Sequence, residues 1–391
     1  MPSGSSSRPE YDICILHLSD ARFYPFFQRQ AFALRDAGYR VALVSWERHK
    51  GEGDPHWEGV DVYPIAIDVD SFRGKWFFIR YVAALSAKLV GIRAKLYQAV
   101  DPVTLPSARL AAMRHNTRYC YFSLEFFQGA DQLVGRPLTR YLWRVAEKFG
   151  IENAEATAVV CRSAGGQLSD LFRIATPHVV RNVPPAAEYA GESSTGLREQ
   201  LGLGPDARLV LYKGDIAPGR GLVPCLRAMS GVENVHLALV GDGRHGRDLA
   251  NLAGELGLQD RVHFQGRVES REFPPLLRQA DMGHVMHENI GANMPYTLPS
   301  KLFDYLHAGL PVLCGNQGEM ASIVRRGNLG WVVDPGHQPS VADALTALTQ
   351  CSPSELRAYR RRARVAAQEY CWELERVAYL EYIRDALAGS R

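Results

Sequence analysis

Residues 293–311 read NMPYTLPSKLFDYLHAGLP, a loop that leads into a short helical pattern. Pro299 suits the first turn of a helix, where a missing N–H costs nothing, and Gly309 followed by Pro311 ends the pattern. The apolar residues between these boundaries recur at spacings of three and four, so they share one face of the helix. The stretch therefore predicts an amphipathic helix that packs onto the core of an α/β domain.

Three polar residues, Ser300, Lys301 and Asp304, lie elsewhere on this short helix. Free N–H groups at a helix N-terminus, with a lysine beside them, favour the binding of phosphate. Asp304 follows one turn later and can accept hydrogen bonds from sugar hydroxyls. The pattern is typical of a site for a nucleotide diphosphate, but an ordinary amphipathic helix has the same boundaries. The neighbouring segments provide the evidence that distinguishes a nucleotide-diphosphate site from an ordinary helix.

Length, charge and cysteine content indicate which classes of protein the chain fits. The chain has 391 residues, which suits two domains of similar size. Its formal net charge of +3 gives no reason to expect a partner nucleic acid. The seven cysteines are an odd number, are scattered and form no Cys-x-x-Cys pair, which fits a cytoplasmic protein and argues against a zinc site.

The sequence gives little sign of a membrane anchor. Residues 1–10 are rich in serine and glycine and predict a disordered tail rather than a signal peptide. No apolar run approaches the ~18 residues of a membrane span. The helical pattern at 76–97 is interrupted by four basic residues, so it lies either on an anionic membrane surface or over the core with a solvated face. We therefore expect at most a peripheral membrane contact.

Apolar runs of strand length alternate with helix-period segments along the chain, which is the signature of α/β domains with parallel sheets. Residues 182–205, rich in Ala, Gly, Ser and Pro, interrupt the alternation and predict a linker. We predict two doubly wound, Rossmann-like domains facing each other across a cleft, at residues 11–185 and 186–369. Ligands of such sheets bind at the carboxyl ends of the strands, so the chemistry is expected in the loops there.

Three of these loops contain glycine. In KGDIAPGRGL, residues 213–222, the glycines let the backbone approach a ligand, and Arg220 can reach a phosphate with two donors. The segment VGDG, residues 240–243, is either part of the same site or a tight turn in which glycine supplies a positive φ. The segment FQGRV, residues 264–268, ends another strand pattern, where exposed backbone can pair with the edge of a base.

In their order and spacing, these segments resemble the C-terminal half of the large retaining glycosyltransferase family with the glycosyltransferase B fold, called group 1 or family 4. The resemblance in this half is carried by residues 214–221, 240–243, 264–268, 298–305 and 308–312. The first half is similar more loosely, at 19–22, 37–41, 101–106 and 182–184. The helix in residues 370–391 resembles the family's terminal helix, which crosses back and joins the first domain.

The resemblance implies that the second domain holds the donor, a nucleotide-diphosphate sugar, with no further cofactor. Arg220 matches the family's diphosphate-binding lysine, Asp304 matches its ribose-binding glutamate, and Arg267 and Val268 match the loop that holds the base. The donor-binding residues implied in this way are Gly214, Arg220, Gly243, Arg267, Val268, Tyr296, Thr297, Leu298, Ser300, Lys301 and Asp304.

The expected catalysis depends on the negative charge that builds on the β-phosphate as the bond between sugar and nucleotide breaks. Arg220, Lys301 and the helix dipole would act on that charge and stabilise the transition state. In the family these groups take the place of a divalent ion, so no metal is expected. Asp68-Val69-Asp70 has the D-x-D pattern that holds a metal in another glycosyltransferase fold, but that fold's other features are missing.

Three positions depart from the family pattern. Tyr296 stands where the family has the first of two glutamates, and Asp215 stands where an arginine follows the first loop glycine. Leu124 replaces a histidine that many members carry beside the acceptor, which leaves Glu125 as the nearest polar group and a third predicted catalytic residue. These changes bear on the identity of the donor sugar and on the acceptor side.

Four residues follow strands of the first domain and are predicted to bind the acceptor: Arg22, Phe23, Asp101 and Glu125. The prediction is a cytoplasmic, metal-independent, retaining glycosyltransferase with a small-molecule acceptor. One alternative is an inactive or atypical nucleotide-sugar-binding homologue, including an enzyme that hydrolyses the donor. Another is a membrane-associated transferase that acts on a lipid-linked or envelope-glycan acceptor. The base, the sugar and the oligomeric state stay open.

Overall fold

The computed structural model describes residues 9–21, 24–47, 57–67, 75–130, 133, 135–191, 196–288 and 293–389. Two predicted acceptor residues, Arg22 and Phe23, lie outside this part of the chain, as do the Asp68-Val69-Asp70 motif and residues 1–8 of the predicted tail. The chain forms two compact units. Unit 1 consists of Met1–Val180 with Arg376–Arg391, and unit 2 is Arg181–Glu375.

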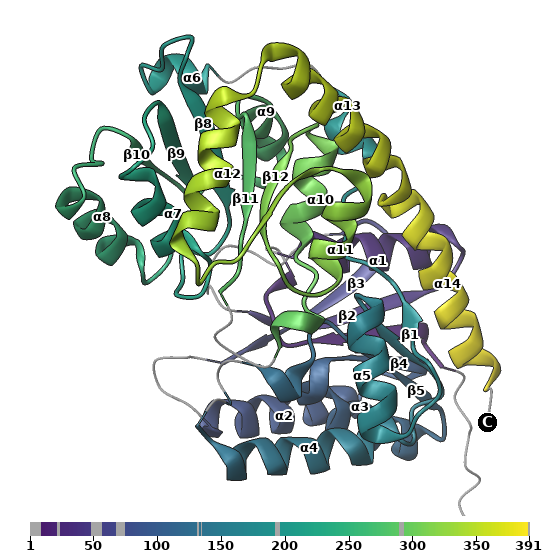
Figure 1. The fold of residues 1–391 in the computed structure, drawn as a ribbon. Helices are drawn as coiled ribbons and strands as arrows, with labels where there is room; N and C mark the ends of the chain where they lie inside the picture. The colour runs from purple at the N-terminus through teal and green to yellow at the C-terminus, as the bar shows by residue number, and fades with distance from the viewer. Residues whose placement is uncertain are drawn as a thin grey trace, which may run out of the picture. The chain divides into compact units, whose positions relative to one another are not determined.

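Unit 1 is built on a seven-stranded sheet in the order β3-β2-β1-β4-β5-β6-β7 (Figure 1). All neighbouring strands pair in parallel. Most residues of the central strands are buried, as expected where helices cover both faces of a parallel sheet. The strands are β1 Tyr11–His17, β2 Val41–Glu47, β3 Val60–Ala66, β4 Ala94–Val100, β5 Arg118–Ser123, β6 Thr157–Val159 and β7 His178–Val179.

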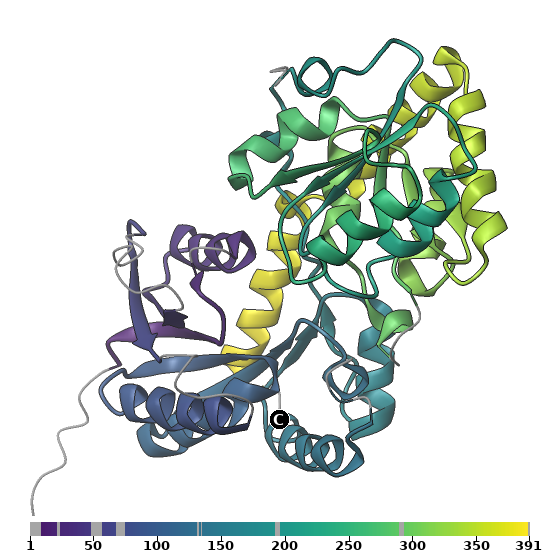
Figure 2. The ribbon, with the colours of Figure 1, turned by 90° about the vertical axis from the view of Figure 1, so that its left-hand side faces the viewer.

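Two groups of helices cover the faces of this sheet. The helices are α1 Pro25–Asp36, α2 Lys75–Leu89, α3 Asp101–His115, α4 Pro137–Ile151 and α5 Arg162–Phe172, with a short 3₁₀ turn, η2, at Phe127–Gly129. Helices α2, α3 and α4 pack side by side (Figure 1). On the opposite face, Gln98 of β4 donates to Gln30 of α1 (2.9 Å) and accepts from Tyr379 (2.8 Å). Tyr379 belongs to α14, Trp372–Ala388, whose residues from Arg376 onward complete unit 1 (Figure 2).

Helix α3 begins at Asp101, directly after β4, and Pro102 occupies its first turn, where proline is tolerated. The helical pattern at 76–97 forms a helix only as far as Leu89, and the chain then turns and enters β4 at Ala94.

Unit 2 contains a six-stranded parallel sheet in the order β10-β9-β8-β11-β12-β13. The strand order reverses between β8 and β11, which pair with each other. Both sheets thus have the doubly wound topology, and the prediction of two Rossmann-like domains is confirmed. The strands are β8 Arg208–Lys213, β9 Val235–Val240, β10 Val262–Gly266, β11 Met282–Val285, β12 Val312–Gly315 and β13 Gly330–Val333.

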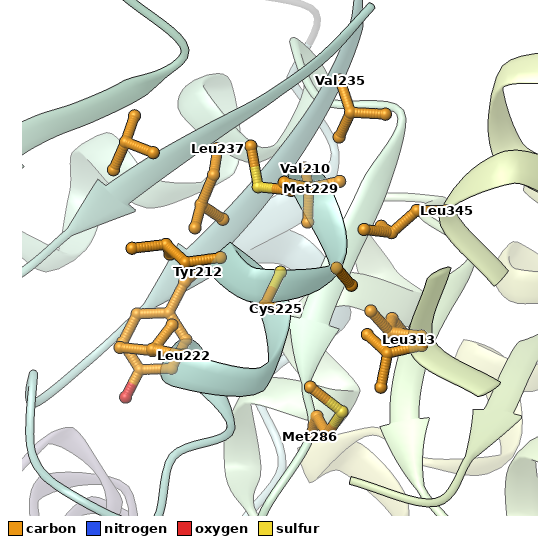
Figure 3. Packing of buried hydrophobic residues seen from close by; sticks show 14 of the residues in the cluster. Val210, Tyr212, Leu222, Cys225, Met229, Val235, Leu237, Met286, Leu313 and Leu345 are labelled. Atoms are coloured by element: carbon orange, nitrogen blue, oxygen red, sulfur yellow. The ribbon is translucent and has the colours of Figure 1, made fainter. Parts of the chain in front are cut away.

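A hydrophobic core of unit 2 lies between the sheet and three helices, α7 Leu222–Met229, α8 Gly246–Glu255 and α12 Gln338–Gln350. Figure 3 shows Leu222, Cys225 and Met229 of α7 against Val210 and Leu237 of the sheet, all 0–1% exposed. The α-helices of the unit are α6 Leu197–Gln200, α7 Leu222–Met229, α8 Gly246–Glu255, α9 Phe273–Arg278, α10 Ser300–His307, α11 Gly318–Gly327, α12 Gln338–Gln350 and α13 Pro353–Glu369. The 3₁₀ turns are η4 Ala186–Tyr189, η5 Ser270–Glu272 and η6 Met294–Tyr296.

The segment predicted as a linker, residues 182–205, contains η4 and α6. Arg198 of α6 donates to Asp281 (3.0 Å) and to the carbonyl of Ala207 (2.6 Å), and Leu197 is fully buried. The described residues of this segment therefore pack within unit 2, although their composition resembles that of a loop.

Candidate functional site in unit 2

The candidate site lies at the carboxyl edge of the unit 2 sheet, where the strand order reverses. Strand β8 ends at Lys213 and strand β11 ends at Val285, so the loops that follow both strands start side by side. Loops diverge at such a point and leave room for a ligand. Gly214, Arg220 and the start of α10, all predicted to bind the donor, belong to the elements at this edge.

Two glycine loops pack backbone against backbone here. The Gly214 amide donates to the Val240 carbonyl (2.9 Å), and the Ile216 amide donates to the Asp242 carbonyl (2.7 Å). Gly241 has φ +142°, and a Cβ there would overlap the Gly214 carbonyl oxygen. A Cβ on Gly243, at φ +157°, would in the same way overlap the carbonyl of Ile216. The glycines of the 240–243 segment are thus required for the two loops to meet.

Helix α10 is placed against the end of β8 by Tyr305. This tyrosine is fully buried, and its ring occupies the space that a side chain at Gly283 of β11 would need. Its hydroxyl accepts from the Lys213 amide (3.0 Å) and donates to the His284 carbonyl (3.0 Å). The helix begins at Ser300, with Pro299 as the residue before its first turn, and the predicted apolar face is fully buried.

Asp304 of α10 is held by two side chains. Its side chain is buried, and its two oxygens accept from different partners. Lys213 Nζ lies 2.8 Å from Oδ2, and the Tyr189 hydroxyl lies 2.9 Å from Oδ1. The carboxylate is therefore fixed in place by a cation and a phenol.

Three cations gather at the same edge of the sheet. Lys301 is half-buried, with Nζ 4.0 Å from the centre of the Tyr212 ring. Burial lowers the pKa of Lys301 well below its usual value, and the positive charges of Arg220 and Lys213 lower it further. Asp215 and Asp304 act in the opposite direction. Lys213, Arg220 and Lys301 thus form a positively charged cluster that would be stabilised by an anion.

Glu288, which follows β11, anchors the loop that carries Arg220. Its amide donates to the Gly219 carbonyl (3.0 Å), and its carboxylate accepts from the Gly221 amide (3.2 Å). Glu288 also lines a hollow of about 620 Å³, together with Asn316, Gln317 and Asp334 from the loops after β12 and β13. The hollow therefore lies along the same carboxyl edge of the sheet.

Two buried histidines lie at the carboxyl end of β11, His284 within the strand and His287 just after it. Their side chains are 0% and 6% exposed. Burial lowers the pKa of His284 to about 4, and Lys301 adds to the effect. Burial, with the charges of Lys301 and Arg220, also lowers the pKa of His287. His287 Nε2 has no hydrogen-bond partner among the described residues.

The predicted base loop carries an exposed ion pair. Arg267 Nε lies 2.6 Å from Asp242 Oδ2, and both side chains are largely exposed. This hydrogen bond raises the pKa of Arg267, and Asp215 contributes through its charge. Val268 is half-buried. The pair joins the 240–243 and 264–268 segments at the ends of neighbouring strands, β9 and β10.

The residues before and at the start of α10 have different structural roles. Tyr296 closes the turn η6, with its amide donating to the Asn293 carbonyl (2.9 Å). The Thr297 hydroxyl donates to the same carbonyl (2.9 Å), and both side chains are half-buried. Leu298 is buried and contributes to the core. Ser300, half-buried, is the first residue of α10.

The described acceptor candidates of unit 1 follow strands β4 and β5. Asp101 has φ +59°, an uncommon conformation for a residue other than glycine, and its Oδ1 accepts from the Leu124 amide (2.9 Å). Burial raises the pKa of Asp101 to about 8, and Glu125 and Glu147 add to the rise. Glu125 itself is exposed. The structure thus brings Asp101 to the turn that contains Glu125.

Several residues of these sites were not singled out by sequence reasoning. Lys213 adjoins Gly214 at the end of a predicted strand, and that position was a usable signal. Tyr189 lies in the segment predicted as a linker, where no pattern pointed to it. Glu147 of α4 is fully buried and accepts from Tyr121 (2.8 Å) and Gln128 (2.7 Å), but it fell within an ordinary amphipathic pattern.

The described residues lack the groupings typical of a metal centre or of a membrane span. Within that part of the chain, no group of three or more His, Cys, Asp or Glu side chains could hold a metal ion. Among the helices that the structure describes, none is both long and apolar enough to cross a membrane.

Known proteins of similar sequence cover parts of the chain. The lipopolysaccharide core biosynthesis glycosyltransferase LpsD of Rhizobium meliloti is 30% identical over 174 residues, 41% of this chain and 48% of the relative. The D-inositol 3-phosphate glycosyltransferase of Acidothermus cellulolyticus is 30% identical over 243 residues, 58% and 52% of the two chains. The chain thus spans about half the length of the curated relatives it matches.

Solved structures show the same fold over almost the whole chain. Sucrose-phosphate synthase from Thermosynechococcus elongatus superposes with a TM-score of 0.80 at 18% identity, covering 97% of this chain and 100% of the other. HepE of Anabaena, in complex with UDP, superposes with a TM-score of 0.71 at 15% identity, covering 95% and 98%.

Family models match both halves of the chain. The model for group 1 glycosyl transferases matches residues 193–366, which include every donor-binding residue predicted from the sequence. The model for the glycosyl transferase 4-like domain matches residues 25–185, nearly all of unit 1. Together with the two Rossmann-like units, these matches show that the chain belongs to the group 1 glycosyltransferases of the glycosyltransferase B fold.

Proposed function

We propose that the protein transfers a sugar from a nucleotide-diphosphate sugar to an acceptor, with retention of the anomeric configuration and without a metal ion. The observation that carries the proposal is the cation cluster of Lys213, Arg220 and Lys301 at the point where the unit 2 sheet reverses its strand order. The carboxylates of Asp304 and Asp215 offset only part of this positive charge, so a bound anion would stabilise the cluster further. A diphosphate has the charge and the oxygen atoms to do so.

The remaining donor groups would be arranged around that diphosphate. Asp304, held by Lys213 and Tyr189, has lone pairs left for the hydroxyls of the ribose. Arg267 and Val268, which directly follow strand β10, would lie against the base. The UDP in the complex of HepE supports testing UDP first.

In the proposed step, the bond between sugar C1 and the β-phosphate oxygen breaks, and the acceptor oxygen bonds to C1 on the same face. The proton of the acceptor hydroxyl passes to the departing phosphate. Negative charge grows on that phosphate in the transition state, where Arg220, Lys301 and the N–H groups at the start of α10 would stabilise it. Asp101 and Glu125 of unit 1, with Arg22 and Phe23, are proposed to bind a small-molecule acceptor.

The first test is a calorimetric titration of the full chain with UDP, GDP, ADP and dTDP. One diphosphate is expected to bind selectively, and Arg220→Ala is expected to weaken its binding about 10- to 100-fold, as for the loss of a charge-assisted contact. The matched control is Arg247→Ala, an exposed arginine on α8, which should bind like the parent protein.

Failure to bind any of the four diphosphates, with the protein folded, would refute the donor site. Binding without transfer or hydrolysis of the corresponding labelled sugar nucleotide would instead favour an inactive homologue. Where transfer occurs, the product anomer, read from the one-bond coupling between C1 and H1 by nuclear magnetic resonance, decides between retention and inversion.

A further inference from the structure

The hollow at the carboxyl edge of the unit 2 sheet is formed by loops that pack closely together. It measures about 620 Å³, within the roughly 300–1,000 Å³ of sites for small organic molecules. A Cβ on Gly318, at φ +65°, would lie 2.6 Å from the Pro295 carbonyl oxygen. A Cβ on Gly315 would lie 3.1 Å from the His287 carbonyl oxygen. The two glycines thus let the loop after β12 approach the segment between β11 and α10 at both of its ends.

The polar side chains around the hollow are little used by the fold. The carboxylate of Glu288 accepts one hydrogen bond, from the Gly221 amide (3.2 Å). The carboxylate of Asp334 also accepts one, from the Gly336 amide (2.9 Å). Neither carboxylate forms an ion pair with a residue that the structure describes. Gln317 Oε1 is buried and has no hydrogen-bond partner in the same part of the chain. These groups therefore keep hydrogen-bonding capacity for a ligand.

The charge of the hollow is opposite to that of the cation cluster. Among the described residues that line it, Glu288 and Asp334 are acidic and none is basic. Helix α11 begins directly after Gln317, and Glu319 in its first turn already compensates the positive end of that helix. Carboxylates and amides bind the hydroxyl groups of a sugar, whereas two carboxylates repel an anion. The hollow thus suits a hydroxylated ligand without negative charge.

The order of the strands places the hollow in line with the proposed donor site. Strands β10, β9, β8, β11 and β12 follow one another across the sheet (Figure 1). Arg267 of the predicted base loop follows β10, and the cation cluster lies where β8 pairs with β11. Glu288 follows β11, Gln317 follows β12 and Asp334 follows β13. Neighbouring strands lie about 4.8 Å apart, so the hollow continues this line by one to two strands. In a sugar nucleotide the diphosphate likewise stands between the base and the sugar.

We propose that this hollow holds the sugar of the donor and selects against sugars with a negative charge, with Glu288, Gln317 and Asp334 as specificity-determining residues. The proposal rests on the proposed function, because the phosphate of the donor has to occupy the cation cluster. Three cations at the diphosphate and two carboxylates at the sugar match a donor whose negative charge lies at one end. A uronic acid would bring a third carboxylate to Glu288 and Asp334 and therefore binds poorly.

The test uses sugar 1-phosphates, which carry a phosphate for the cluster and a sugar for the hollow but no base. The full chain is titrated by calorimetry at about pH 8, where the phosphate has lost its last proton. The ligands are inorganic phosphate and the α-1-phosphates of glucose, galactose, mannose and glucuronic acid. At least one neutral sugar phosphate should bind about tenfold or more tightly than inorganic phosphate, as for a hydrogen bond to a charged group. Glucuronic acid 1-phosphate should bind no more tightly than inorganic phosphate.

Charge substitutions in the hollow identify the residues that discriminate. Asp334→Lys and Gln317→Lys should each lower the preference for the neutral sugar phosphate over glucuronic acid 1-phosphate about tenfold, because a cation then faces the uronate. The preference is a ratio of two affinities, so a general effect of the added charge on phosphate cancels. Asp334→Lys gives up the contact with the Gly336 amide, whereas Gln317→Lys removes no hydrogen bond of the described structure. Gln317→Lys therefore tests the proposal even if the other variant is unstable.

Two exposed residues of unit 2 supply matched controls. Asp206 lies in a turn before β8, at the amino edge of the sheet, and Gln350 is the last residue of α12. Asp206→Lys and Gln350→Lys make the same changes of charge away from the hollow. Both should leave the ratio of affinities unchanged.

The proposed function and this proposal fail in different ways. Absence of phosphate binding, or binding that survives Arg220→Ala unchanged, would refute the cation cluster as a donor site, and this proposal with it. Phosphate binding without a gain from any neutral sugar would overturn only the role of the hollow. The same holds if glucuronic acid 1-phosphate binds as tightly as the best neutral sugar phosphate, or if Gln317→Lys and Gln350→Lys give the same ratio.

Discussion

Lys213 Nζ and Asp304 Oδ2 lie 2.8 Å apart and join the end of strand β8 to the second turn of α10. The two residues are 91 positions apart in sequence. Asp304 is thus a fixed acceptor with a defined orientation, and Lys213 belongs to both the ion pair and the cation cluster. Any ligand that enters the cluster has to share Lys213 with Asp304.

The first prediction concerns the stability of this pair. Lys213→Met should lower the free energy of unfolding by about 2 kcal/mol, because it leaves the largely buried Asp304 without its cation. Lys213→Met/Asp304→Asn should recover part of the loss, because the unpaired charge is then gone. Urea denaturation of both single variants and the double variant gives the coupling. Strict additivity of the two substitutions would show that the pair contributes nothing.

The second prediction concerns protons taken up with the ligand. Burial, Arg220 and Lys213 lower the pKa of Lys301, so its free form gives up its proton at a lower pH than an ordinary lysine. A bound diphosphate would raise that pKa again. Protons are therefore taken up on binding, and affinity falls as the pH rises above the lowered pKa.

Calorimetry of diphosphate binding in buffers of different ionisation enthalpy measures this uptake. It should be done well above about pH 6, where the terminal phosphate has lost its last proton. Lys301→Arg is the control, because arginine keeps its charge and should show little uptake. Equal uptake by the parent protein and Lys301→Arg would contradict the prediction.

The third prediction tests the contact between the glycine loops. Gly241→Ala should lower the free energy of unfolding by about 3 kcal/mol and abolish diphosphate binding, because the new Cβ overlaps the Gly214 carbonyl at a positive φ. Gly254→Ala in α8 is the matched control. Nothing lies within 4 Å of a Cβ there, so the change should stabilise the helix by about 0.5–1 kcal/mol. A Gly241→Ala protein as stable as the parent would show that the loops can separate cheaply.

The fourth prediction concerns the pH dependence of stability. Burial raises the pKa of Glu147 from 4.5 to about 7, so the folded state keeps a proton that the unfolded state has already lost in that range. Stability therefore falls as the pH rises from 4.5 to 7, by about 1.4 kcal/mol per pH unit for this group.

Glu147→Gln should remove this contribution and raise the free energy of unfolding at pH 8 by up to about 3 kcal/mol. Glutamine can still accept from Tyr121, and it can donate to Gln128 Oε1, a buried atom with no partner in the described structure. Denaturant melts of both proteins at several pH values supply the comparison. Parallel pH profiles would exclude Glu147 as the source of the slope.

The sequence predicted the doubly wound topology because parallel strands are buried on both faces and appear as continuous apolar runs. It located α10 from Pro299 and Gly309, whose effects on the backbone are local. It did not predict the partners of Asp304, because these contacts are not local in the sequence. Tyr189 reaches Asp304 across 115 positions, and no spacing rule connects them.

The division of unit 1 between Met1–Val180 and Arg376–Arg391 determines the order in which the units can be completed during synthesis. Tyr379, Tyr382 and Ile383 of α14 are fully buried in that unit. A nascent chain halted at Glu375 would contain all of unit 2, but unit 1 would still lack this part of its core. Most of unit 1 therefore leaves the ribosome first, but unit 1 is the last unit to complete its core. Until then, the apolar surface that receives α14 is open to chaperones and to aggregation.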